Sequence, residues 1–502
     1  MTDYVVRDTQ LTSIADAIRA KNSTSAPISF PDGFVSAVQA FPDAMILDSL
    51  SVTENGVYTP SSGHAYSEVT VDVSGGGGDT SMEDAIITAM LSGTYSNSRV
   101  SVIGQYAFTE NAYLESVYFP NVLEIKPFAF SSCTQLKTLS FPECQALYGF
   151  GTFSSCQSLS EVSMPKVELI GSGAFYMCSN LTTINFPMCT SIGNYAFNYC
   201  SNLTNMNLPM CETMGEFAFY SCLGLTSIDF PMCTTIGSNA FAYNTNLTSL
   251  NFPMCTLISN NAFSMCTNLA SIGFPACTTI SNNAFTNCSS LTTISFPSCE
   301  LIGGHAFLYC GSLTAVYFPN CTSISNNAFA SCSGLTTVSF PICTFIGNMA
   351  FANCASLTNL NFPMCTFISS SAFYKCTNLT TVNFPVCATI EGSAFNNCIN
   401  LTTISFPACT TINGSYTFSS CYNLLSAYFL GSSIPVLKYS NIFYSTPIAG
   451  RTTSTNGAYG SIFVRASLLT AFQSARYWSA FSSRIVGLTD EQIAELDAQE
   501  GE

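Results

Sequence analysis

The amino-acid sequence predicts a repeat solenoid, in which short parallel β-strands stack along an array and irregular or short helical segments return the chain. Three observations predict this fold class. A 22-residue unit recurs from Leu114 to Leu424, its apolar positions keep a fixed spacing, and a proline follows each strand-like stretch. One unit is too short to bury its own apolar face, so neighbouring units have to share one continuous interior.

The repeat can be followed through fourteen units, two of which are one residue longer than the others. The unit from Leu181 to Asn202 has the sequence LTTINFPMCTSIGNYAFNYCSN. In its first six positions, Leu, Ile and Phe are expected inside, and the alternation from the third position to the sixth predicts a strand whose third and fifth positions face outside. A second apolar set follows a Gly/Ser/Asn turn such as Gly193–Asn194, and it predicts the return segment of each coil.

The units resemble the BspA-type leucine-rich repeat family of bacteria, whose repeats carry the same strand, Phe-Pro break and I-x-x-x-A-F-x-x-C segment. The resemblance covers about three fifths of the chain. It implies a leucine-rich repeat solenoid. Because members of this family are often surface adhesins, it also implies a binding role, although fold analogy is weak evidence for any particular ligand.

The two ends of the chain break the period and predict small α+β modules. Helical patterns at residues 11–18 and 34–41 and a hairpin turn at Asn55–Gly56 fit an attachment or oligomerisation module. The aromatic residues Trp478 and Phe481 fit a terminal cap, with Trp478 packed rather than ligand-binding. The expected order is a module over 1–74, a Gly-rich linker over 75–80, an N-terminal cap over 81–113 that begins with a helix at Ser81, the solenoid over 114–424, a C-terminal cap or accessory module over 425–487 and an acidic tail over 488–502.

The first 74 residues also resemble modules of tail-fibre and other virion proteins of phages and prophages of Gram-positive gut bacteria. The motifs LTSIADAIRAK, FPDGF and VTENGVYTP carry this resemblance. It implies that residues 1–74 contact other virion tail proteins, that the protein is a homo-oligomer with a trimer as the expected form, and that it lies in the virion tail after synthesis in the host cytoplasm. The predicted function is then a phage tail fibre or tail-associated adhesin that binds the host surface through the solenoid, and the alternative is a BspA-type cell-surface adhesin.

Composition argues against two classes of partner. With 29 acidic and 13 basic residues, the chain has a net charge of −16, which repels a phosphate backbone, so nucleic acid is not expected as a partner. No stretch of about eighteen apolar residues runs without polar interruption, so a membrane span is not expected. The first 25 residues lack the apolar run of an export signal, which favours the virion interpretation over the cell surface.

All 25 cysteines lie in the array and form two columns, F-P-x-C as at Cys189 and A-F-x-x-C as at Cys200. Zinc sites usually need C-x-x-C pairs, which the sequence lacks. Equivalent positions without cysteine, such as Val122, Val167 and Asn244, keep the unit intact. We therefore expect stacked, buried, apolar side chains rather than disulfides or metal ligands.

Catalytic motifs are lacking as well. His64 and His305 are the two histidines of the chain, and no phosphate-binding loop, nucleophile elbow or dinucleotide fingerprint occurs. We therefore expect neither enzymatic activity nor a cofactor or metal. A polysaccharide-active enzyme with its site in the C-terminal module is the third interpretation that the sequence leaves open.

The predicted binding residues form two rows, and the expected partner is a glycan or protein of the host cell surface. One row occupies the fifth strand position, where amides, carboxylates and tyrosine rings suit hydroxyl-rich ligands. The other row precedes the return-segment cysteine. Keeping an exposed sheet soluble is the alternative explanation for the first row, and packing between coils is the alternative for the second. The residues are Tyr118, Asn185, Asn207, Asp229, Asn251, Tyr317, Asn361 and Asn383 in the strand row, and Tyr199, Tyr243 and Tyr309 in the return row.

Overall fold

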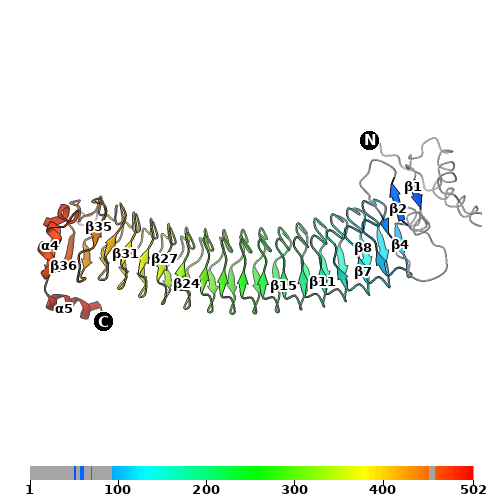
Figure 1. The fold of residues 1–502 in the computed structure, drawn as a ribbon, viewed down its shortest axis with the longest axis horizontal. Coiled ribbons are helices and arrows are strands. Elements are labelled where there is room, and N and C mark those ends of the chain that lie inside the picture. Colours follow the sequence, from blue (N-terminus) through cyan, green and yellow to red (C-terminus); the bar gives the residue numbers. More distant parts are fainter. Residues whose placement is uncertain (1–49, 53–56, 61–68, 71–92, 452–457, 501–502) are drawn as a thin grey trace, which may run out of the picture. The chain divides into compact units, whose positions relative to one another are not determined.

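The computed structural model describes residues 50–52, 57–60, 69–70, 93–451 and 458–500 of the chain. The chain divides into two compact units, residues 1–225 and residues 226–502. In both units most of the described residues form stacked coils whose strands lie side by side in parallel (Figure 1). The predicted fold class, a parallel β-solenoid with few helices, is confirmed.

Each coil of the first unit contributes a three-residue strand and a two-residue strand. Equivalent strands of successive coils form two parallel ladders along the unit, of which the first, formed by the three-residue strands, is interrupted between residues 138–140 and 161–163. The first ladder already includes residues 94–96, which precede Leu114 by one coil. The three-residue strands are β4 (Thr94–Ser96), β6 (Ser116–Tyr118), β8 (Thr138–Ser140), β10 (Glu161–Ser163), β12 (Thr183–Asn185) and β14 (Asn205–Asn207), and the two-residue strands are β5 (Val102–Ile103), β7 (Glu124–Ile125), β9 (Ala146–Leu147), β11 (Leu169–Ile170), β13 (Ser191–Ile192) and β15 (Thr213–Met214).

The second unit repeats the arrangement. Its two-residue strands follow one another in sequence order within one sheet, while its three-residue strands pair in shorter groups. The three-residue strands are β16 (Ser227–Asp229), β18 (Ser249–Asn251), β20 (Ser271–Gly273), β22 (Thr293–Ser295), β24 (Ala315–Tyr317), β26 (Thr337–Ser339), β28 (Asn359–Asn361), β30 (Thr381–Asn383) and β32 (Thr403–Ser405), and the two-residue strands are β17 (Thr235–Ile236), β19 (Leu257–Ile258), β21 (Thr279–Ile280), β23 (Leu301–Ile302), β25 (Ser323–Ile324), β27 (Phe345–Ile346), β29 (Phe367–Ile368), β31 (Thr389–Ile390), β33 (Thr411–Ile412) and β35 (Val436–Leu437).

The register of the ladders follows the sequence period. Ile184 of β12 pairs with Val162 of β10, one 22-residue step away, and both side chains are buried. In the longer coil of the first unit, Leu169 pairs with Ala146, so the extra residue is accommodated outside the strands. Because each side chain thereby stacks on its equivalent, every apolar position of the repeat becomes a column through the core.

Two columns of phenylalanine form the centre of this core. In the first unit, Phe175 and Phe197 stack with ring centroids 5.2 Å apart, and Phe186 packs against Phe197 at 6.4 Å in a tilted arrangement. In the second unit, Phe263 and Phe285 repeat the stacking at 5.3 Å. All five rings are fully buried. Aromatic pairs of this kind contribute about 0.5–1.5 kcal/mol each beyond the apolar area that they bury.

The return segments are turns, so the irregular form of the prediction is confirmed for the described coils. Each coil places residues with a left-handed backbone four positions apart, as at Tyr195 (φ 58°) and Tyr199 (φ 60°). The bend of the chain therefore lies closer to Tyr195 and Tyr199 than the predicted position at Gly193–Asn194. Glycine at 193 has another reason, since a Cβ there would lie 2.7 Å from the backbone nitrogen of Ser172 in the preceding coil.

The C-terminal residues extend the sheet and close its apolar interior. Strands β34 (Ser426–Phe429), β36 (Ser461–Arg465) and β37 (Ile485–Leu488) continue the parallel pairing, with helices α4 (Leu469–Ser474) and η2 (Trp478–Arg484) between β36 and β37. Trp478 is buried, and its Nε1 donates a hydrogen bond of 2.7 Å to the carbonyl oxygen of Pro435. The prediction that Trp478 is packed is confirmed. The acidic tail forms helix α5 (Asp490–Glu500).

Near the N-terminus, β1 (Leu50–Val52) and β2 (Val57–Pro60) pair antiparallel on either side of the predicted Asn55–Gly56 turn, and β3 (Val69–Thr70) pairs with β2. The predicted helices at 11–18 and 34–41, the linker at 75–80 and the capping helix at Ser81 lie outside the described residues. Within the part of the chain that is described, none of the helices has the length and apolar character needed to cross a bilayer.

Candidate functional site

The strand row lies on the outer face of the three-residue strands, as the alternation predicts. Tyr118 and Tyr317 expose 47% and 61% of their surface, whereas Val117 and Val316 beside them are buried. Asn185 is half-buried and the remaining predicted members are exposed. The row is a line along the strands of each unit rather than a pocket, because one residue per coil contributes to it.

Hydrogen bonds between coils order several side chains of the strand row. In the first unit, Asn207 Nδ2 donates to Asn185 Oδ1 at 2.6 Å, and Asn185 Nδ2 donates to Ser163 Oγ at 2.9 Å. In the second unit, Asn251 Nδ2 donates to Asp229 Oδ1 at 2.8 Å, and Asn383 Nδ2 donates to Asn361 Oδ1 at 3.3 Å. These bonds hold the amides in one orientation, so a ligand would meet a preorganised polar surface with less rotamer entropy to lose.

The return row occupies the second left-handed position of each coil. Tyr199, Tyr243 and Tyr309 have φ values of 60°, 63° and 62°, and all three are exposed. A left-handed conformation costs an ordinary L-residue about 1–2 kcal/mol, and asparagine and glycine tolerate it best. Tyrosine at these positions therefore does not stabilise the backbone conformation. Its presence there favours a role for the outward-facing ring more strongly than it would on a strand.

An aromatic groove in the first unit contains one of the predicted tyrosines together with residues that the sequence analysis did not single out. Its volume is about 670 Å³. Tyr199 packs edge-on against Tyr176 and Tyr220, with ring centroids 6.5 and 5.6 Å away. The lining residues are Phe128, Phe150, Ser154, Ser155, Gly173, Tyr176, Tyr195, Asn198, Tyr199, Phe217 and Tyr220. Aromatic residues that interrupt a column of polar and small residues are the sequence signal that points to this groove.

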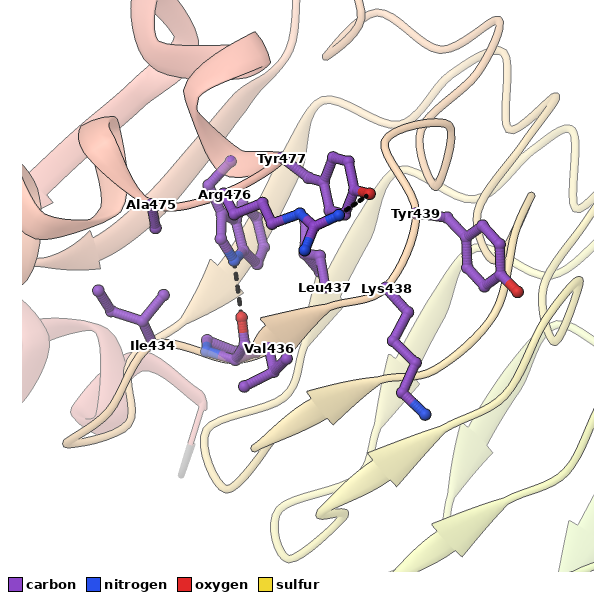
Figure 2. A pocket seen from close by; sticks show the side chains of 10 residues that line it. Ile434, Val436, Leu437, Lys438, Tyr439, Ala475, Arg476 and Tyr477 are labelled. Atoms are coloured by element: carbon purple, nitrogen blue, oxygen red, sulfur yellow. Dashed lines mark hydrogen bonds between the residues drawn. The ribbon is translucent and has the colours of Figure 1, made fainter.

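A second hollow, of about 560 Å³, lies at the C-terminal end of the second unit between the segments 434–439 and 475–478. Figure 2 shows the guanidinium of Arg476 against the ring of Tyr477, to whose hydroxyl it donates a hydrogen bond of 2.8 Å. Lys438 also lines the hollow, and Trp478 forms part of its wall. The described residues that line it include no carboxylate, histidine or thiol.

The cysteine columns are buried, and their thiols bond to the backbone. Cys200 Sγ donates to the carbonyl oxygen of Phe175 in the preceding coil at 3.1 Å, and Cys189 Sγ donates to Ser191 within its own coil at 3.3 Å. Burial raises the pKa of Cys189 to about 12, despite hydrogen bonds from the backbone that act in the opposite direction. Such thiols are poor nucleophiles and poor metal ligands at neutral pH, because both roles need the thiolate.

Groups of three or more potential metal ligands do not occur among the described residues. The 25 cysteines are free and buried in this structure, which agrees with the predicted packing role.

Comparison with known proteins places the repeat in a family. A family model described as BspA type leucine rich repeat region (6 copies) matches residues 90–204, 168–276, 234–358 and 344–456. A solved leucine-rich repeat protein from Bacteroides ovatus is 28% identical over 52% of this chain and 82% of its own, with a TM-score of 0.36. A leucine-rich cell surface protein from Faecalibacterium prausnitzii is 24% identical over 66% of this chain and 90% of its own, with a TM-score of 0.39. No curated protein matches the chain.

Proposed function

The chain belongs to the BspA-type leucine-rich repeat family, and from that premise we propose that it is a non-enzymatic adhesin acting at a bacterial surface. The strand row carries the proposal. It offers mostly neutral, hydrogen-bonding side chains at one repeated position, on strands whose inward side chains are buried or half-buried. A long row of this kind suits a repetitive polymer, such as a surface glycan, because each coil can contact one part of the ligand and weak contacts add up.

Electrostatics supports a neutral or weakly charged ligand. Charged residues make up 8% of the chain, and the net charge is −16. An anionic polymer would be repelled, whereas a neutral glycan pays no such penalty. Among the predicted residues of the strand row, Asp229 is the charged one. Its carboxylate accepts a hydrogen bond from Asn251.

A non-enzymatic role is supported by the surface chemistry. Glycoside hydrolysis ordinarily needs two carboxyl groups that flank the bond to be cleaved. Neither of the two hollows described above includes a carboxylate among its lining residues. The third interpretation, an enzyme in the C-terminal module, has no observation in its favour.

The proposal can be tested by incubating the fluorescently labelled full chain with whole Gram-positive bacteria and with their isolated surface polysaccharide. We expect saturable binding that falls roughly tenfold or more in the double variant Tyr118→Ser, Tyr317→Ser, since each change removes a flat contact surface. Serine occupies the same strand position at Ser140 and Ser339, so the variant copies coils that already fold.

The matched control is Met364→Ala, which changes an exposed residue in the F-P-x-C stretch, where Ala276 and Ala408 occur naturally. It should bind as the unchanged chain does. Equal binding by all three proteins would rule out the strand row as the contact surface, and no binding by the unchanged chain would rule out the adhesin role for the bacteria tested.

A second candidate function is a phage tail fibre or tail-associated adhesin. The motifs LTSIADAIRAK, FPDGF and VTENGVYTP within residues 1–74 favour it. In this candidate, residues 1–74 join other virion tail proteins and the protein assembles as a homo-oligomer, for which a trimer is the proposed form. The solenoid then meets the host surface with the same strand row.

Antibody labelling separates the two candidates. Electron microscopy of purified virions would show label at the tail if the protein is a tail fibre, and thin sections of intact bacteria would show label on the envelope if it is a cell-surface adhesin. Analytical ultracentrifugation of the full chain tests the oligomer, and a monomer at micromolar concentration would contradict it.

A further inference from the structure

The aromatic groove of the first unit owes its hollow shape to one column position. This position is the first left-handed residue of each coil, and in successive coils it is Phe128, Gly151, Gly173, Tyr195 and Phe217. Rings therefore project from the coils on both sides of the two glycines. Tyr195 and Phe217 stack with centroids 5.0 Å apart, and Phe128 lies 5.5 Å from Phe150.

Gly173 leaves space between these two groups of rings. A Cβ at this position would meet Phe150 Cζ at 3.5 Å, which is ordinary contact, so the position is open to a larger side chain. Gly151 differs, because a Cβ there would lie 2.8 Å from Phe128 Cε1. The ring of Phe128 thus covers Gly151, and the groove opens over Gly173. Exposed faces of Phe150, Tyr195 and Tyr199 border it.

Asn198 supplies an amide group to this largely aromatic groove. Asn198 lines the groove, although the residue is only 4% exposed. Among the described residues, its side-chain Oδ1 has no hydrogen-bond partner. The equivalent residue in the second unit, Asn396, accepts a hydrogen bond of 2.9 Å from Asn397 Nδ2. A buried amide oxygen without a partner is destabilising, and the hydroxyl of a bound ligand would donate the missing hydrogen bond.

We propose that this groove binds one ring of a neutral hexopyranose polysaccharide. The C–H face of the sugar lies on the ring of Tyr195 or Phe150, and one sugar hydroxyl pairs with the Asn198 amide after a rotation that turns it toward the groove. Since the amide can present either its oxygen or its NH2 group, it can accept from or donate to that hydroxyl. The inference rests on the adhesin proposal and names its ligand class.

The uncharged lining of the groove favours a neutral sugar over other flat ligands. None of the described residues that line the groove is charged. A nucleotide base would also stack on the rings, but its phosphate would find no cation there, and the net charge of −16 opposes it. An acidic sugar meets the same opposition, so the neutral ring is the ligand that the groove fits.

The test uses the full chain and three neutral probes, cellohexaose, maltohexaose and chitohexaose, with oligomeric sialic acid as the charged comparison. We expect saturation-transfer NMR to show contact with the sugar C–H protons of at least one neutral probe, and calorimetry to give its Kd. The variants Tyr195→Asn and Asn198→Ala should each weaken binding roughly tenfold. Both copy residues found at the same coil position elsewhere, as in Asn239 and Ala242.

Two controls in the second unit make the same changes outside the groove. Met349→Asn matches Tyr195→Asn at the first left-handed position, and Asn396→Ala matches Asn198→Ala. Both should leave the Kd unchanged. In addition, Gly173→Phe should abolish binding, because phenylalanine already adopts the same backbone conformation at Phe128 and Phe217 and would fill the groove.

Failure of the inference is distinguishable from failure of the adhesin proposal. No saturation transfer from any neutral hexasaccharide, preferential binding of the sialic acid oligomer, or equal Kd values for groove and control variants would each overturn the groove assignment. The adhesin proposal depends instead on the cell-binding assay and on the variants of Tyr118 and Tyr317. A chain that binds bacteria but no probe therefore refutes the groove assignment alone.

Discussion

At the scale of single residues, the return segments explain which positions of the repeat are free to vary. Two positions in each coil require a left-handed backbone, and asparagine or serine occupies many of them, as at Asn327 and Ser331. These residues tolerate the conformation because their short polar side chains bond locally. The apolar positions between them are fixed by burial, as Ala328 and Phe329 show.

Substitution of Asn327 tests this requirement. Its φ is 57°, so Asn327→Val should lower the free energy of unfolding by about 1–2 kcal/mol, because a β-branched side chain disfavours a left-handed backbone. Asn327→Gly should change it by a few tenths at most. Urea unfolding followed by circular dichroism measures both. Equal stability of the two variants would contradict the backbone conformation assigned here.

At the scale of the elements, one coil is the unit that the protein can gain or lose. The strands of the coil over residues 291–312 pair with equivalents 22 residues away, such as Thr293 with Ser271 and Ile302 with Ile280. Phe296 and Phe307 of this coil stack between equivalent rings on both sides. Removing the coil therefore brings together two surfaces that are already complementary.

We expect deletion of residues 291–312 to preserve a cooperatively folded chain with unchanged β-structure per residue. A deletion of residues 291–301, half a coil, should prevent normal folding, because it shifts buried positions onto exposed ones. Circular dichroism and limited proteolysis compare the two. Similar protease resistance of both deletions would contradict the conclusion that coils are equivalent modules.

At the scale of the whole molecule, the buried thiols couple stability to pH. Burial raises the pKa of Cys321 to about 11 and that of Cys343 to about 12, from an ordinary value of 9.0. Between pH 9 and these values, an unfolded chain has lost thiol protons that the folded chain keeps. The free energy of unfolding therefore falls with rising pH, by up to about 1.4 kcal/mol per pH unit for each thiol.

In a reducing buffer we expect the urea midpoint to be insensitive to thiol ionisation below pH 9 and to fall steeply from pH 9 toward pH 11. The double variant Cys321→Val, Cys343→Val should give a shallower decrease, since it removes two of the responsible groups. Valine occupies the equivalent position at Val122 and Val167, where it is buried. A midpoint that stays constant up to pH 11 would show that the thiols are not buried as described.

Much of the fold could be predicted from the sequence alone, because the determining information is periodic. The 22-residue spacing predicts the stacking step, the alternation around Ile184 predicts which strand positions are buried, and Pro187 marks the end of the strand. The packed role of Trp478 and the outward position of Tyr118 and Tyr317 could be inferred in the same way. Burial of one apolar face is a local property of each unit, repeated many times.

The tertiary structure alone decided which side chains meet across coils. The sequence predicts Tyr199 as a member of the return row, but it offers no reason to join this residue with Tyr195, Phe150, Gly173 and Asn198. That groove depends on left-handed backbone angles, which redirect side chains, and on the extra residue of one coil, which places Phe150 beside Gly173. The left-handed angles recur in every coil, but the spacing of the apolar residues does not reveal them. The extra residue is visible in the sequence, but the place where the coil accommodates it is not.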